Sequence, residues 1–201
     1  MSEQIPVKLS ADGIAAAAQA AAGESKTRSL PPVHLWNPPF VGNLDIRIAR
    51  DGTWFHEGSP INRHKLVQLF SSILRKEGDD YYLVTPVEKV GITVEDAPFV
   101  AVDFNVSGEG QDQVLTFETH VGDFASVGPE NPIRVAFDDQ SDTPSPYVMV
   151  RDGLEALIDR KSFYRLVDLG SSHEVDGQNW FGVWSGGEFF PLIPEEALAA
   201  G

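Results

Sequence analysis

The chain has 201 residues, of which 42% are hydrophobic and 10% aromatic, and this composition is typical of a globular protein rather than a disordered one. It contains no cysteine, which excludes disulfides and thiolate metal sites and fits a reducing cytoplasm. The formal net charge of −15 argues against a nucleic acid polymer as partner, because such a field repels phosphate backbones. A small anionic ligand held by a few arginines stays compatible with this charge, since local charge decides there.

Residues 1–30 are expected to form a flexible tail with a short helix. The alanine-rich run from Ile14 to Ala22 follows Asp12, which can cap a helix, and it is too short to span a bilayer. No cationic segment precedes a strongly apolar one, so no signal peptide is predicted. We expect a cytoplasmic protein without a membrane span.

Residues 31–98 are predicted to form a first α+β unit. Apolar and polar residues alternate from Leu44 to Ile48, which is the period of a half-buried strand, and the pair Asp51-Gly52 predicts a hairpin turn into TWFHE. Asn62 is expected to cap a helix that ends at Gly78. The segments YYLVT and GITVE are then expected to be two further strands.

Residues 99–201 are predicted to form a second α+β unit with extra strands. The polar segment DDQSDTPSP (138–146) has the composition of a loop. The pattern of the first unit then returns: PYVMV, an RDG turn, LEALI, and a helix that Asp159 can cap. Two closing strands are expected around Gly186-Gly187.

The two units resemble each other in sequence. ARDG at 49–52 matches VRDG at 150–153, and Ile61-Asn62-Arg63 matches Ile158-Asp159-Arg160. We interpret this as an internal duplication. The predicted fold class is α+β, with two related strand-strand-helix-strand-strand units, the second larger.

Cationic residues recur at equivalent places in the two units. Arg63 and Arg160 fall at the start of their helices, where free backbone N–H groups favour an anion and an arginine can add a forked contact. The alternative is a structural salt bridge to a carboxylate such as Asp51, Glu88 or Asp96, and the sequence favours neither.

The tests for catalytic and metal chemistry are largely negative. Glu118 and His120 would share one face of a strand, but two ligands without a third are more often a solvated face. His56 and Glu57 are adjacent on a strand and point to opposite faces, so they cannot act as an acid–base pair there. We predict no cofactor, no metal and no catalytic residue.

Four segments carry a resemblance to a known family: LWNPPFVG, DGTWFHEGSPINRHKLVQLFSSILR, YYLVTPVEKVGITVEDAPF and YVMVRDGLEALIDRKSFYRLVDLG. Over residues 30 to 192 the chain resembles the bacterial family catalogued as domain of unknown function 1285. The resemblance implies an α+β protein of two related units, the second loosely pleckstrin-homology-like. It also implies a nucleotide-like ligand between the units and a role in signal transduction. Six residues match the family motif and are the expected ligand contacts: Trp54, His56, Arg63, Lys89, Arg151 and Arg160. Trp54 has a second interpretation, because a tryptophan in such a strand is more often core than ligand platform.

The leading hypothesis is a non-enzymatic sensing or adaptor protein that binds a small anionic or nucleotide-like ligand. The first alternative is a protein–protein interaction module without a small ligand, which would use sheet surface or edges. The second is a hydrolase that pairs His56 or His120 with a carboxylate.

Overall fold

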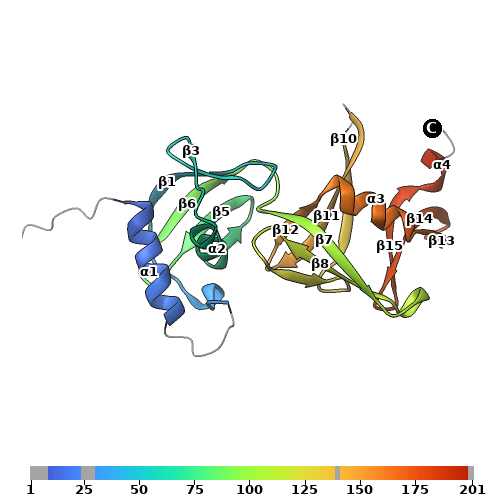
Figure 1. Ribbon diagram of the computed structural model, residues 1–201, viewed down its shortest axis with the longest axis horizontal. Helices are drawn as coiled ribbons and strands as arrows, with labels where there is room; N and C mark the ends of the chain where they lie inside the picture. The colour runs from blue at the N-terminus through green and yellow to red at the C-terminus, as the bar shows by residue number, and fades with distance from the viewer. Residues whose placement is uncertain (1–8, 24–29, 139–140, 199–201) are drawn as a thin grey trace, which may run out of the picture. The chain divides into compact units, whose positions relative to one another are not determined.

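The structure is a computed structural model that describes residues 9–23, 30–138 and 141–198. The chain divides between Asp96 and Ala97 into two compact units (Figure 1). Both are mixed α+β, with many strands and few helices, and each contains a six-stranded sheet. The predicted α+β class is confirmed at this level.

The described part of unit 1 consists of α1 (Ala11–Gly23), a 3-10 turn η1 (Val33–Leu35), β1 (Phe40–Ile48), β2 (Trp54–His56), β3 (Ser59–Pro60), α2 (His64–Ser72), β4 (Leu74–Glu77), β5 (Asp80–Val84) and β6 (Lys89–Val94). The strand order in its sheet is β3-β2-β1-β6-β5-β4. The β1–β6 pair is parallel, and the other neighbours are antiparallel.

The predicted β1–β2 hairpin is confirmed. The N–H of Gly52 donates to the carbonyl of Ala49 (2.9 Å), and the Asp51 side chain accepts from the N–H of Thr53 (2.9 Å). Directly after β2, Glu57 and Gly58 both have positive φ, 49° and 76°. This is the conformation of a tight two-residue hairpin turn, so β3 folds back onto β2 at once.

The prediction for α2 is wrong at both ends. The N-cap is Arg63 rather than Asn62, and it makes no side-chain capping hydrogen bond. The helix ends at Ser72, and Leu74–Glu77 is the strand β4 instead of the last helical turn. Gly78 (φ +62°) lies in the tight turn of the β4–β5 hairpin rather than at a helix terminus. Pairing with β5 buries Leu74 against the sheet, and this tertiary contact overrides the helical periodicity.

The core of unit 1 lies between the sheet and α2. Trp54 on β2 stacks on Phe70 of α2 with ring centroids 6.1 Å apart, and both side chains are fully buried. α1 packs against α2 and buries Ile14 and Ala18 (Figure 1). The start of α1 is capped by Ser10, whose hydroxyl accepts from the N–H of Gly13, and not by Asp12.

The described part of unit 2 consists of β7 (Phe99–Ser107), a 3-10 turn η2 (Gly110–Asp112), β8 (Val114–Thr119), β9 (Phe124–Ser126), β10 (Ile133–Asp138), β11 (Ser141–Arg151), β12 (Leu154–Ile158), α3 (Arg160–Asp168), β13 (Ser171–Val175), β14 (Gln178–Ser185), β15 (Glu188–Pro194) and α4 (Glu195–Leu198). The six-stranded sheet has the order β10-β11-β12-β7-β8-β9, with β12 and β7 parallel. β9 also approaches β11, so this sheet curls into a half-barrel.

The last three strands form a separate antiparallel sheet, β13-β14-β15. Two closing strands were predicted and three are present. The buried Ser185 of β14 joins this sheet to the half-barrel, because its hydroxyl accepts from the N–H of Leu115 (3.0 Å) and donates to the carbonyl of Val127 (2.8 Å). Asp159 caps α3 as predicted, since its carboxylate accepts from the N–H of Ser162 (2.7 Å).

The polar segment 138–146 is not a simple loop. Its residues from Ser141 onward belong to β11, which forms a hairpin with β10. Pairing with β12 begins only at Tyr147, so this end of β11 pairs with β10 alone. A strand that is paired on one side tolerates Pro144 and Pro146, which lack a backbone N–H.

Candidate functional site

Unit 1 carries a groove of about 340 Å³ at the start of α2. Its wall comes from the start of α1, from the β2–β3 hairpin and from the first turns of α2. The lining residues are Ala11, Asp12, His56, Ser59, Pro60, Ile61, Asn62, Arg63, Leu66 and Phe70. Two of the six predicted ligand contacts, His56 and Arg63, therefore share one site.

The local sequence explains how the groove forms. The Glu57-Gly58 turn brings Ser59 back opposite His56. The N–H of Ile61 then donates to the carbonyl of Trp54 (2.7 Å), which fixes the chain just before α2. One short stretch of sequence thus supplies most of the rim.

The groove combines a cationic side chain with an uncapped helix start. Arg63 is exposed, and among the described residues its guanidinium has no ion-pair or hydrogen-bond partner. The N–H groups of His64 and Lys65 lie in the first turn of α2, which has no side-chain cap. Free N–H groups and the helix dipole favour an anion at this end. The carboxylate of Asp12 lies in the wall of the same groove and is the only acidic side chain among the described residues that line it.

Lys89 does not line the groove. Its ammonium pairs with Glu77 at 2.8 Å and lies 4.7 Å from the ring centre of Tyr82. Glu77 also pairs with Arg75, which donates to the carbonyls of Val33 (3.0 Å) and Trp36 (2.7 Å). The hydrogen bond from Lys89, aided by Arg75, lowers the pKa of the Glu77 carboxyl. Lys89 therefore belongs to an ion-pair network that holds the proline-rich segment before β1 against β4.

Trp54 lies in the core, with 1% of its surface exposed, and it does not line the groove. Its indole Nε1 is buried and has no hydrogen-bond partner among the described residues. Its contact with the groove is indirect, because Phe70 stacks on Trp54 and also lines the groove.

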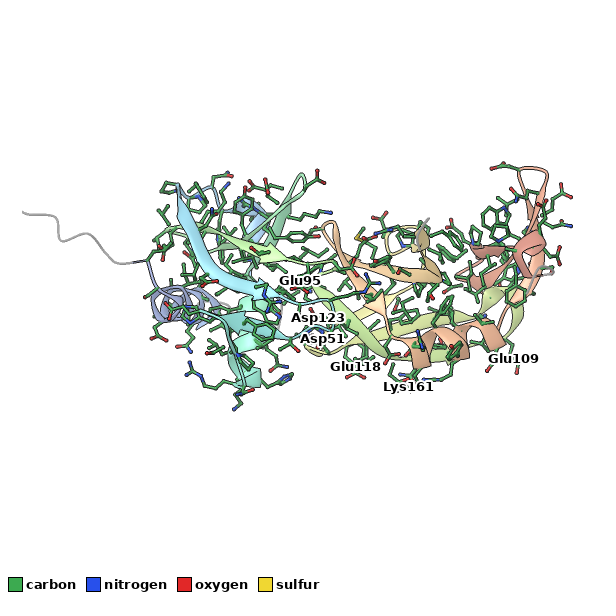
Figure 2. All side chains as sticks on the ribbon, turned by 90° about the horizontal axis from the view of Figure 1, so that it is seen from above. Asp51, Glu95, Glu109, Glu118, Asp123 and Lys161 are labelled. Carbon is green, nitrogen blue, oxygen red and sulfur yellow. The ribbon has the colours of Figure 1, made fainter. Side chains whose placement is uncertain are left out.

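Arg151 and Arg160 belong to unit 2 and have different surroundings. Arg151 pairs with Asp123, labelled in Figure 2, and lies over the ring of Phe99 at 5.0 Å. Arg160 is exposed in the first turn of α3, and within residues 9–23, 30–138 and 141–198 it has no ion pair. The nearby helix start is already occupied by the Asp159 carboxylate.

The expected pairing of Glu118 and His120 on one strand is wrong. β8 ends at Thr119, and His120 lies in the following turn. Its ring Nδ1 accepts from the backbone N–H of Val100 (3.1 Å), and the backbone N–H of His120 donates to the carbonyl of Val100 (2.8 Å). Within the described residues no group of three or more acidic or histidine side chains could hold a metal ion.

Several groove residues were missed by sequence reasoning. Leu66 and Phe70 have the spacing of one helical face, which predicts burial in the core but not that both residues also line a groove. The place of Asp12 in the groove was not predictable from the sequence, because only tertiary packing brings α1 to α2.

None of the helices in the described residues is long and apolar enough to cross a membrane.

The comparisons with known proteins match this architecture. Residues 31–97 match the family model for the N-terminal domain of unknown function DUF1285, and residues 98–192 match the model for the C-terminal domain of the same family. The chain belongs to the DUF1285 family. The N-terminal domain model begins at residue 31, so α1 and its Asp12 lie outside the matched region.

Two solved structures of DUF1285 proteins are similar to the chain. One, from Silicibacter pomeroyi DSS-3, is 63% identical with a TM-score of 0.80, and the match covers 90% of this chain and 97% of that one. The other, from Shewanella baltica OS155, is 30% identical with a TM-score of 0.49, and the match covers 61% of this chain and 90% of that one. No curated protein matches the chain.

Proposed function

We propose that this DUF1285 protein is a ligand-sensing or adaptor protein whose unit 1 binds a small anionic, nucleotide-like ligand in the groove at the start of α2. The anionic group would contact Arg63, His56 and the first N–H groups of α2. Ile61, Leu66 and Phe70 line the same groove and would contact an apolar or aromatic part of the ligand.

The observation that carries the proposal is the contrast between Arg63 and the other described arginines of unit 1, all of which form ion pairs. Arg47 pairs with Glu95, Arg50 with Asp96 at 3.0 Å, and Arg75 and Lys89 both pair with Glu77. Among the described residues Arg63 has no such carboxylate, although it lies at a helix start that favours an anion. A guanidinium in that place can form a forked pair with a phosphate or carboxylate.

Thermal unfolding in the presence of inorganic phosphate and of nucleoside monophosphates tests the proposal. A probe at about one hundred times its Kd adds roughly 2.7 kcal/mol to the free energy of unfolding. Arg63→Ala and His56→Ala should reduce the shift. Lys65→Ala is the matched control, because Lys65 is an exposed cation of α2 outside the groove lining and should leave most of the shift.

A shift of equal size in the native protein and in Arg63→Ala would show that the anion binds elsewhere. No shift with any of these probes would contradict the proposal as a whole.

The wider expectations from the sequence are also proposals and not findings. They are a signalling role, a cytoplasmic location, a common origin of the two units, a pleckstrin-like second unit, and a contribution of Lys89, Arg151 and Arg160 to the ligand. A common origin is supported by the element order, since a hairpin, a helix and three strands occur in this order in both units, with the short strand β3 added before the helix in unit 1. The strand pairing differs, because β6 joins β1 in unit 1 while β13–β15 form their own sheet.

A further inference from the structure

The strand β13 is an open edge of the small sheet in unit 2. It pairs with β14 on one side, and within the described residues no strand pairs with its other side. Ser171 to Glu174 are all exposed. In an antiparallel ladder alternate residues direct their N–H and C=O groups away from the partner strand, so β13 presents such groups to solvent.

This edge lacks several of the features that usually prevent a further strand from adding, and Glu174 is its one acidic side chain. Its sequence SSHEV contains no proline or lysine, and its register with β14 runs without a bulge to the Asp176-Gly177 turn. Natural proteins commonly block exposed edges with these devices. The outer edge of β13 can therefore form main-chain hydrogen bonds with an extended segment.

The two faces next to this edge have different chemistry. On one face His173 forms a ring cluster with Trp184 and Phe189, with centroids 4.9 Å from His173 in both cases. Because neighbouring strand residues point to opposite faces, Ser172 and Glu174 lie on the other face.

That other face is acidic. The hydroxyl of Ser172 donates to Glu195 at 2.5 Å, so Glu195 reaches from α4 to the edge strand. Glu174, Glu195 and Glu196 line an open groove of about 760 Å³ together with Gly177, Gln178 and Asn179. No cation in the described part of the chain forms an ion pair with these three carboxylates.

We propose that β13 accepts an extended peptide segment of a protein partner whose side chains alternate between cationic and apolar. The segment adds to the sheet as a fourth strand through main-chain hydrogen bonds. Its lysine or arginine side chains face Glu174 and Glu195, and its apolar side chains lie beside the ring cluster of His173. Main-chain pairing supplies affinity in such complexes, and the alternating side chains supply specificity. The site lies in unit 2 and does not depend on the anion groove of unit 1.

The probe is a short fluorescent peptide of alternating arginine and valine, titrated against the whole protein by anisotropy. One control peptide carries glutamate in place of arginine, and another carries proline at alternate positions to remove N–H donors. The proposal expects binding of the first peptide alone, with new hydrogen-exchange protection at the outward-facing amides of β13.

Charge-reversal variants separate this site from general attraction to an acidic protein. Glu174→Lys combined with Glu195→Lys should weaken the arginine–valine peptide by about tenfold at low salt. Asp79→Lys combined with Glu130→Lys changes the net charge equally at exposed positions that belong neither to β13 nor to the acidic groove, and it should weaken binding by less than about threefold.

Equal effects of the two variant pairs, or equal binding of the proline peptide, would overturn the proposal. So would the absence of binding of the arginine–valine peptide to the native protein.

Discussion

The starts of α2 and α3 have nearly the same sequence and different structures. Ile61-Asn62-Arg63 leads into α2 and Ile158-Asp159-Arg160 into α3. In unit 2 the acidic residue is the N-cap and its carboxylate accepts from an N–H of the first turn. In unit 1 the cap position has moved by one residue onto Arg63, whose side chain forms no capping bond.

This difference of one residue in the cap position makes the start of α3 purely structural, while the start of α2 is a candidate binding site. At α3 the Asp159 carboxylate already occupies the place of an anion. At α2 the first N–H groups have no side-chain cap, and a guanidinium lies beside them over a groove. A repeated sequence pattern therefore does not imply a repeated role.

The largest expected effect concerns the core beneath α2. Trp54 has no aromatic counterpart on β12, whose buried positions are Leu154, Ala156 and Ile158. Trp54→Ala removes its stacking on Phe70, and we expect the free energy of unfolding to fall by about 3–5 kcal/mol. Urea unfolding measures this. A loss below about 1 kcal/mol would contradict the role of Trp54 as a main contact of the unit 1 core.

The second prediction compares the two helix starts directly. Asp159→Ala should lower the free energy of unfolding by about 1 kcal/mol, because it removes the cap of α3. Asn62→Ala should change it by less than about 0.5 kcal/mol, since Asn62 makes no capping bond. Denaturant unfolding of both variants gives the comparison, and equal losses would contradict the difference between the two helix starts.

The third prediction replaces the missing cap. Arg63→Ser places a hydroxyl at the N-cap of α2, and we expect a gain of about 0.5 kcal/mol in the free energy of unfolding. The same variant should lose phosphate-dependent stabilisation. A stabilised protein that still responds to phosphate would remove Arg63 from the anion site.

The smallest expected effect tests the role of Lys89 through its partner. The pKa of Glu77 is lowered, so its ion pairs stabilise the fold above the unfolded-state pKa near 4.3, and this contribution is lost as the pH falls through the folded-state pKa. The carboxylate side chain is 38% exposed, so Glu77→Gln should cost only a few tenths of a kcal/mol at pH 7. At about pH 3 the difference from the native protein should shrink toward zero. Urea unfolding at both pH values measures it, and a cost that is independent of pH would contradict an ionic role for Glu77.

The hairpins at the DG and GG pairs were predictable, because these pairs between alternating strands act through local backbone preference, whereas the β2–β3 and β4–β5 hairpins were not predicted. Asp152-Gly153 and Gly186-Gly187 have the positive φ angles that such turns require. The Asp159 cap was predictable for the same reason, since capping is local. The end of α2 was not predictable, because the helical spacing of Ile73 and Leu74 continues into a segment that pairing with β5 turns into a strand.

The candidate site was predictable only in part. His56 and Arg63 follow one another closely along the chain, and the turn between them brings both to one groove. Lys89 and Arg151 were chosen as cations, but Glu77 and Asp123 pair with them across distances in sequence that no local pattern reports. The open edge of β13 depends on sheet order, which the sequence does not contain.

The most direct measurement is a titration of the whole protein with inorganic phosphate, followed by backbone amide NMR. Anion binding at the start of α2 predicts that the amides of His64 and Lys65 shift with a saturable response, while the amide of Ser162 at the capped start of α3 stays unchanged. Equal shifts at both helix starts, or none at His64 and Lys65, would contradict the central claim.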